Sequence, residues 1–249
     1  MASIILIHGA WQGSWVWKDV KNELQALGHV VQTPDLAVPP KTESEPQSPA
    51  TLEAYINRIT DAIARAPEPV ILVAHSMGGI PATVAATRTG KRVSKLIYLA
   101  AFVPCDGDSL LTLTNLQHSE HQLPLIFDDD AKATTVAEDG IIPFFLADAS
   151  VGCAAYAKSK FTPQPLAPIT TPAALDHLVL ESISRCYILC SQDRAIEPSL
   201  QRLMAIRANC PIMQELASGH CPFISRPQLL SSIIHRLTND QPAESPSST

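Results

Sequence analysis

The ten residues 70–79 constrain this chain more than any other stretch. The apolar run before Ser76 is rich in β-branched residues and predicts a buried strand, whereas the residues after Gly79 predict a helix. Ser76 therefore lies on the tight turn between them. Small residues two positions before and after the serine, Ala74 and Gly78, let the two backbones approach closely. The pattern indicates a nucleophile elbow, in which a strained serine exposes its hydroxyl.

The usual elbow pattern is Gly-x-Ser-x-Gly, and Ala74 departs from it by one methyl group. Taken alone, the pentapeptide also fits an ordinary loop of small residues between a strand and a helix, because such short motifs occur by chance. The choice between the two interpretations depends on the rest of the chain.

Composition limits the classes of protein to consider. A chain of 249 residues with 46% hydrophobic content forms one large domain, or one domain with an insertion. Its net charge of −6, without basic clusters, argues against a nucleic acid or membrane partner. The first apolar run begins at Ile4 without a charged leader, and no apolar segment reaches the roughly 18 residues that span a bilayer. We therefore expect a soluble, cytoplasmic protein.

The cysteines do not indicate a metal site or a disulfide framework. Six of them are scattered along the chain, and Cys186 and Cys190 match no common zinc-finger spacing. Reduced thiols are expected, and neither a metal nor a cofactor is predicted.

Strand and helix patterns alternate over most of the chain. Strands are predicted at residues 3–8, 29–33, 70–75, 93–100, 185–190 and 212–216, and helices at 14–27, 51–66, 80–89, 198–207 and 227–237. Six strands joined by helices predict an α/β fold with a doubly wound parallel sheet.

The alternation breaks between the fourth and fifth strands. There an acidic run at 128–130 and a proline-rich run at 161–168 interrupt short apolar patches. We predict a core of residues 1–104 and 183–240 and an inserted, mainly helical cap at 105–182. A surface loop is predicted at 38–49 and a disordered tail at 241–249.

Two polar residues follow strands at the edge where a parallel sheet gathers its catalytic groups. Asp193 comes directly after the fifth strand and His220 directly after the sixth. The order Ser76, Asp193, His220 along the chain is the order of an α/β-hydrolase triad. In such a triad, the histidine takes the serine proton and the aspartate fixes the histidine tautomer. The backbone N–H groups of Met77 and Ala10 are predicted to form the oxyanion hole.

Alternatives exist for several of these residues. Asp193 also fits a simple turn, and Asp35, after the second strand, is its rival as the triad acid. His8 and His75 lie near the site, but rings hydrogen-bonded to the backbone are common at such positions. Trp11 is a candidate for substrate contact.

Five segments carry a resemblance to a known family: residues 8–15 (HGAWQGSW), 74–79 (AHSMGG), 99–104 (LAAFVP), 190–193 (CSQD) and 218–220 (SGH). Together they resemble the plant methylesterase and hydroxynitrile lyase branch of the α/β hydrolases and its bacterial esterase relatives. The resemblance implies the α/β-hydrolase fold, ester hydrolysis without a cofactor, a helical cap over an apolar pocket and frequent homodimers. Phe102, within the third segment, is a further candidate for substrate contact.

The resemblance also distinguishes esterases from lyases. Lyases that resemble this chain carry a threonine where Gly9 stands and a lysine where Cys221 stands, and that lysine handles the cyanide leaving group. We therefore predict a carboxylesterase-type serine hydrolase that cleaves small, largely uncharged esters through an acyl-enzyme. A hydroxynitrile lyase and a ligand-binding receptor with a hydrolase fold remain the alternatives.

Overall fold

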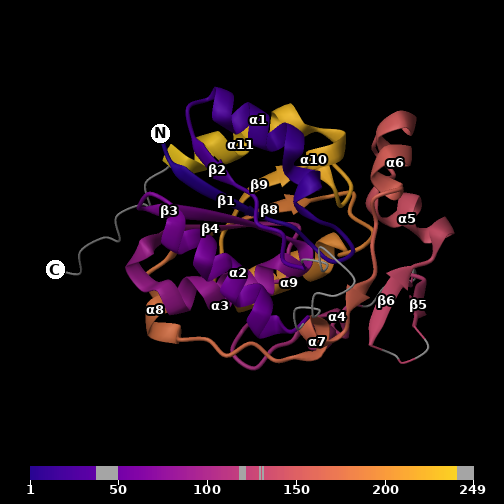
Figure 1. Ribbon diagram of the computed structural model, residues 1–249, viewed down its shortest axis with the longest axis horizontal. Helices are drawn as coiled ribbons and strands as arrows, with labels where there is room; N and C mark the ends of the chain where they lie inside the picture. The colour runs from indigo at the N-terminus through magenta and orange to yellow at the C-terminus, as the bar shows by residue number, and fades with distance from the viewer. Residues whose placement is uncertain (38–49, 118–121, 129, 131, 240–249) are drawn as a thin grey trace, which may run out of the picture.

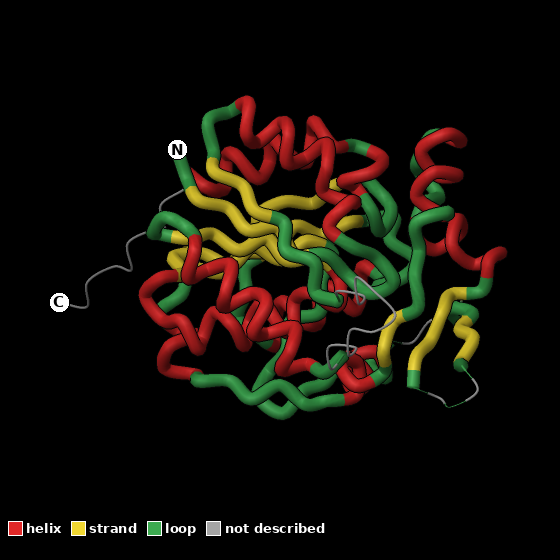
Figure 2. Tube along the Cα trace, viewed as in Figure 1, coloured by secondary structure: helices red, strands yellow, loops and turns green. Residues whose placement is uncertain are grey.

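A six-stranded parallel sheet forms the centre of the computed structural model, which describes residues 1–37, 50–117, 122–128, 130 and 132–239. Its strands are β1 (Ser3–Ile7), β2 (Val30–Gln32), β3 (Val70–His75), β4 (Val93–Leu99), β8 (Ser184–Cys190) and β9 (Ile212–Leu216). They are arranged in the order β2-β1-β3-β4-β8-β9, and every pair is parallel. This arrangement confirms the predicted sheet (Figure 2).

Helices cover both faces of the sheet (Figure 1). One layer contains α1 (Lys18–Ala26), α10 (Pro222–Ser225) and α11 (Pro227–Asn239), and the other contains α2 (Leu52–Arg65), α3 (Gly79–Thr89) and α9 (Pro198–Arg207). Alternate side chains of a strand point to opposite faces. Accordingly, Ile5 and Ile7 of β1 pack with the α2–α3 layer, whereas Ile4 and Leu6 pack with the α1–α11 layer. A strand buried on both faces explains the continuous apolar run in the sequence.

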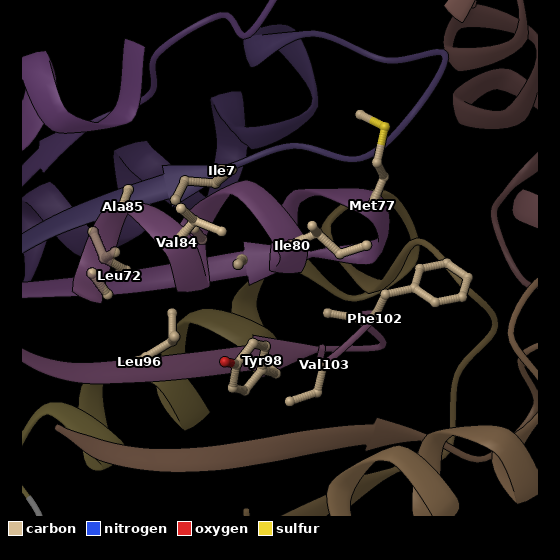
Figure 3. Close-up of a cluster of buried hydrophobic side chains, with 14 of the residues drawn as sticks. Ile7, Leu72, Met77, Ile80, Val84, Ala85, Leu96, Tyr98, Phe102 and Val103 are labelled. Atoms are coloured by element: carbon tan, nitrogen blue, oxygen red, sulfur yellow. The ribbon is translucent and has the colours of Figure 1, made fainter. Parts of the chain in front are cut away.

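The helix behind Ser76 is fixed by the core. Figure 3 shows Leu72, Ile80, Val84 and Tyr98 in one buried cluster, to which β3, α3 and β4 contribute. Fully burying a side chain of this size contributes about 1.5–3 kcal/mol. The hydroxyl of Tyr98 lies 2.7 Å from Thr83 Oγ1, which in turn donates to the Gly79 carbonyl. The first turn of α3 is therefore held by both packing and hydrogen bonds.

The segment between β4 and β8, called the cap below (residues 105–182), contains helices and a small sheet. The helices are α4 (Leu110–Thr114), α5 (Glu138–Phe145), α6 (Val151–Lys158), α7 (Ala167–Thr170) and α8 (His177–Glu181). The sheet is antiparallel and consists of β5 (Leu125–Phe127), β6 (Ala133–Val136) and β7 (Gln164–Pro165). A mainly helical cap was predicted, and the sheet was not, because β7 has only two residues and pairs with a strand about 30 residues earlier.

The cap is not a single layer over the sheet. Figure 1 places α5, α6, β5 and β6 beyond the carboxyl ends of the central strands, whereas α8 lies beside α3. The predicted boundaries at 105 and 182 stay a prediction.

Other differences from the sequence-based expectation are small. The helix predicted at 14–27 starts as a 3₁₀ turn, Ser14–Trp17, and the second strand is shorter than predicted. The predicted loop at 38–49 and tail at 241–249 lie outside the described residues. Among the helices that the structure describes, none combines the length and the apolar character that a membrane span requires.

Candidate active site

Ser76 lies at the junction of β3 and α3, on the turn that the sequence predicted. Its φ is 53°, in the left-handed region that residues other than glycine rarely adopt. Such a conformation costs on the order of 1–3 kcal/mol and persists only when the surroundings enforce it. Part of that enforcement comes from the segment after β4, since the N–H of Phe102 donates to the Ser76 carbonyl at 3.1 Å.

Close packing explains the glycine two positions after the serine. A Cβ atom on Gly78 would lie 2.5 Å from the carbonyl oxygen of His8 and 2.9 Å from Cγ2 of Ile7. The end of β1 therefore presses directly against the turn after β3. Any side chain at this position would push the two elements apart.

Asp193 and His220 meet at the carboxyl ends of β8 and β9. His220 Nδ1 donates to Asp193 Oδ2 at 2.8 Å, and both side chains are buried. The other carboxylate oxygen, Oδ1, accepts hydrogen bonds from the N–H groups of Ala195 and Ile196 at 2.8 and 3.0 Å. These contacts fix the carboxylate in one orientation, so the imidazole proton stays on Nδ1.

Gln201 is a third member of this network, which the sequence analysis missed. Its Nε2 donates to Asp193 Oδ2 at 3.0 Å, and its Oε1 accepts from the N–H of Cys190 at 3.1 Å. The only sequence signal is a polar residue on the inward face of α9, where Leu200 and Met204 also lie and where Gln201 is fully buried. Since a buried amide requires partners, that position was detectable as unusual, but its partner was not.

His220 leaves its second ring nitrogen available. Nε2 is buried and makes no hydrogen bond within the described part of the chain, so no bond joins it to Ser76 Oγ in this structure. The ring lies between His75 and Phe145, with centroid distances of 4.5 and 5.3 Å. Catalytic hydrogen bonds are often long without substrate, so this geometry is compatible with proton transfer from the serine.

His75 forms a hydrogen bond with the backbone of His220. Its Nε2–H donates to the His220 carbonyl at 3.0 Å. Burial, and next the nearby His220, hold the pKa of His75 well below its usual value, so its ring stays neutral. A neutral neighbour matters because a second cation at this distance would disfavour the imidazolium that forms if His220 acts as the predicted base. The expected role of His75, a ring bonded to the backbone, agrees with these contacts.

Asp35 and His8, the other candidates near the site, make different contacts. Asp35 accepts hydrogen bonds from the N–H and the hydroxyl of Ser14, and its side chain is half exposed. His8 Nδ1–H donates to the Gly9 carbonyl at 2.9 Å, and Nε2 accepts from the N–H of Leu36 at 3.0 Å. Burial lowers the pKa of His8, which is consistent with a neutral ring holding two backbone segments together.

The two predicted oxyanion donors follow neighbouring strands. Ala10 comes after β1 and Met77 after β3, and these strands pair in parallel. Gly9 brings the loop after β1 (residues 8–13, called the oxyanion loop below) against the serine, because a Cβ atom there would lie 2.8 Å from Ser76 Cβ and 3.3 Å from Oγ. The role of the two N–H groups stays a prediction.

We expect Gly9→Ala to lower ester turnover by a factor on the order of 10², because the added methyl group displaces either the serine or the oxyanion loop. Steady-state hydrolysis of 4-nitrophenyl butyrate measures the effect, with circular dichroism to verify the fold. Gly152→Ala in α6 is the matched control, since a Cβ atom there meets nothing within 4 Å. A Gly9→Ala enzyme as active as this control would contradict the prediction.

The two predicted substrate contacts occupy different surroundings. Trp11 is half-buried, and its ring meets that of Phe145 edge-on at 5.8 Å. Phe102 is only 4% exposed and belongs to the core cluster of the α2–α3 layer, at one end of which Figure 3 places it with Met77. Contact between substrate and either ring stays a prediction.

Comparison with known proteins identifies the family. Residues 4–233 match the model of the alpha/beta hydrolase family. The chain belongs to this family, in agreement with its sheet order, its strained serine turn and the polar residues at the carboxyl ends of its strands.

Several relatives are named esterases. Methylesterase 9 of Arabidopsis thaliana is 26% identical, covering 97% of this chain and 100% of that protein. The carbendazim hydrolyzing esterase of Nocardioides sp. (strain SG-4G) is 40% identical over 114 residues, which span 45% of this chain and 47% of the relative. A pyrethroid hydrolase from Sphingobium faniae JZ-2 has a similar structure, with a TM-score of 0.84 at 25% identity over 96% of this chain and 97% of that chain. The prediction of a carboxylesterase-type hydrolase is confirmed.

Proposed function

We propose that this protein hydrolyses carboxylic esters with Ser76 as nucleophile, His220 as general base and Asp193 as the residue that orients the base. The observation that carries the proposal is the 2.8 Å bond from His220 Nδ1 to the buried Asp193 carboxylate, with Nε2 of the same ring left without a hydrogen bond among the described residues. A base held in this tautomer can accept a proton only at Nε2.

In the acylation step, Ser76 Oγ attacks the ester carbonyl while its proton moves to His220 Nε2. The N–H groups of Ala10 and Met77 donate to the oxyanion of the tetrahedral intermediate. When the intermediate collapses, the proton on Nε2 passes to the leaving alkoxide, and the acyl group remains on the serine.

In the deacylation step, water attacks the acyl-serine and gives its proton to His220 Nε2. The second intermediate collapses, Ser76 recovers the proton and the carboxylic acid leaves. Asp193 accepts the Nδ1–H bond throughout and stabilises the imidazolium in both steps. No cofactor enters this mechanism.

The neutral surroundings of His220 favour an esterase over a lyase. Burial keeps the pKa of Cys221 well above its usual value, so the thiol beside His220 stays neutral, and Gln12 Nε2 donates to its sulfur at 3.3 Å. A lyase must stabilise an expelled cyanide with a nearby cation. An esterase stabilises its oxyanion with backbone donors and requires no such cation.

The proposed substrates are small, largely uncharged esters. An aromatic cluster adjoins the proposed base, since Phe145 meets the ring of His220 edge-on and also contacts Trp11 and Phe161. The names of the relatives add methyl esters and carbendazim to the compounds worth testing. A cytoplasmic location and a homodimer remain predictions.

Turnover with simple esters and mandelonitrile separates the three candidate functions. We expect many cycles of 4-nitrophenyl butyrate hydrolysis per protein molecule and no cyanide release from mandelonitrile above the spontaneous rate. A receptor with this fold would give a single burst or no product at all. Cyanide release as fast as ester turnover would show that the proposed chemistry is wrong.

A further inference from the structure

Trp11 connects the oxyanion loop to the cap. Its carbonyl accepts a hydrogen bond from the N–H of Thr162 at 3.0 Å, and its indole Nε1–H donates to the carbonyl of Thr134 in β6 at 3.0 Å. The indole ring also meets Phe145 of α5 edge-on. All three partners belong to the cap, so one residue of the core is held by three separate parts of the inserted segment.

The backbone of Trp11 has an unfavourable conformation. Its φ is 58°, in the left-handed region that disfavours residues with a Cβ atom other than asparagine and aspartate. Trp11 directly follows Ala10, whose N–H is the proposed oxyanion donor. Relaxation of Trp11 to an ordinary φ would redirect the chain next to this donor.

The proposed catalytic residues are buried in this structure. Ser76 is 6% exposed and His220 is 1% exposed, and Phe145 of the cap packs edge-on against the ring of His220. Any movement of β6 and of the segment around Thr162 away from the core would break both hydrogen bonds to Trp11.

We propose that closure of the cap assembles the oxyanion hole, with Trp11 as the positioning residue that couples the two events. In the open state Trp11 loses both bonds and its backbone relaxes, so the loop that carries Ala10 leaves its active position. In the closed state the cap restores the strained conformation around the bound ester. The inference rests on the proposed function, because it assigns the oxyanion to Ala10.

Trp11→Phe tests this coupling, because it keeps an aromatic ring and removes the indole N–H that donates to the cap. We expect kcat for 4-nitrophenyl butyrate to fall by roughly 10- to 100-fold, with KM within about threefold of the parent value. Trp15→Phe is the matched control, since Trp15 also contacts the cap through Tyr156 but lies outside the oxyanion loop. It is expected to stay within about twofold of the parent.

A pair of inhibitors distinguishes positioning from general damage. Ser76 Oγ adds to the carbonyl carbon of an alkyl trifluoromethyl ketone, the serine proton moves to His220, and the carbonyl oxygen becomes an oxyanion. The matching methyl ketone binds without this addition. In Trp11→Phe, the affinity for the trifluoromethyl ketone is expected to fall by the same factor as kcat/KM, with that for the methyl ketone unchanged. An equal loss for both ketones, or a variant as active as Trp15→Phe, would overturn the proposal.

The unmodified protein provides a test that does not depend on any variant folding. Coupling is reciprocal, so an oxyanion on Ser76 must stabilise the closed cap. We expect the trifluoromethyl ketone to slow hydrogen exchange of the Thr162 amide about tenfold or more, and the methyl ketone to leave it unchanged. Equal exchange with both ketones contradicts the coupling. If mass spectrometry finds no adduct on Ser76 and no ester is hydrolysed, the proposed function has failed instead.

Discussion

Replacement of Ser76 by alanine is expected to reduce ester turnover by a factor on the order of 10³ or more while the fold remains intact. The change removes one oxygen atom from a side chain that no core packing depends on. At a φ of 53°, the conformational free-energy cost of alanine is nearly the same as that of serine, so the strain on the turn is unchanged. Any residual activity comes from the oxyanion donors, which remain in place.

Initial rates of 4-nitrophenyl butyrate hydrolysis measure this loss, and thermal melting verifies that the variant folds. Ser94→Ala is a suitable control, since Ser94 lies near the start of β4, at the opposite end of the strands, where its hydroxyl donates to the Val70 carbonyl. The control is expected to keep its activity. Turnover by Ser76→Ala within tenfold of the parent value would refute the assignment of the nucleophile.

The elements that were predicted from sequence are those that depend on local patterns. The strand before Ser76 is a continuous apolar run because both of its faces are buried, and the turn requires small residues because β1 presses against Gly78. Asp193 and His220 were found from their positions after two strands. A parallel sheet brings the ends of its strands to one edge, so sequence positions alone placed them near each other.

The features that were missed depend on the packing of one element on another, or on contacts between residues far apart in the chain. Gln201 reaches Asp193 only after α9 has packed on β8, and Trp11 reaches Thr134 across 123 positions of sequence. The cap sheet is similar, since Gln164 pairs with Thr134 in a strand too short to show periodicity. Gln201 was detectable as a polar residue on an inward helix face, but no local pattern identifies the partners in any of these contacts.

The electrostatic design of the site is also a product of packing. His8, His75 and Cys221 are all buried near the proposed base, and burial favours the neutral form of each one. The carboxylate of Asp193 accepts the Nδ1–H bond of His220 directly. A buried carboxylate in this position stabilises the imidazolium that forms when the proposed base takes a proton.

Asp193→Asn tests this arrangement, and we expect it to lower kcat by a factor on the order of 10⁴ with little change in KM. The N–H groups of Ala195 and Ile196 donate to Oδ1, so the asparagine oxygen takes that position and its amide nitrogen faces His220. An amide N–H donates to Nδ1 of the ring and moves the imidazole proton to Nε2. The base is then protonated at the atom that must accept the proton of Ser76.

Asp35→Asn is the matched control for this substitution, since Asp35 is the alternative acid and caps the turn at Ser14 instead of contacting His220. It is expected to keep turnover within a few fold of the parent, because an asparagine oxygen still accepts the hydrogen bond from the Ser14 N–H. The kcat values of both variants with 4-nitrophenyl butyrate decide the question. A large loss in Asp35→Asn together with an active Asp193→Asn enzyme would move the triad acid to the end of β2 and leave the fold unchanged.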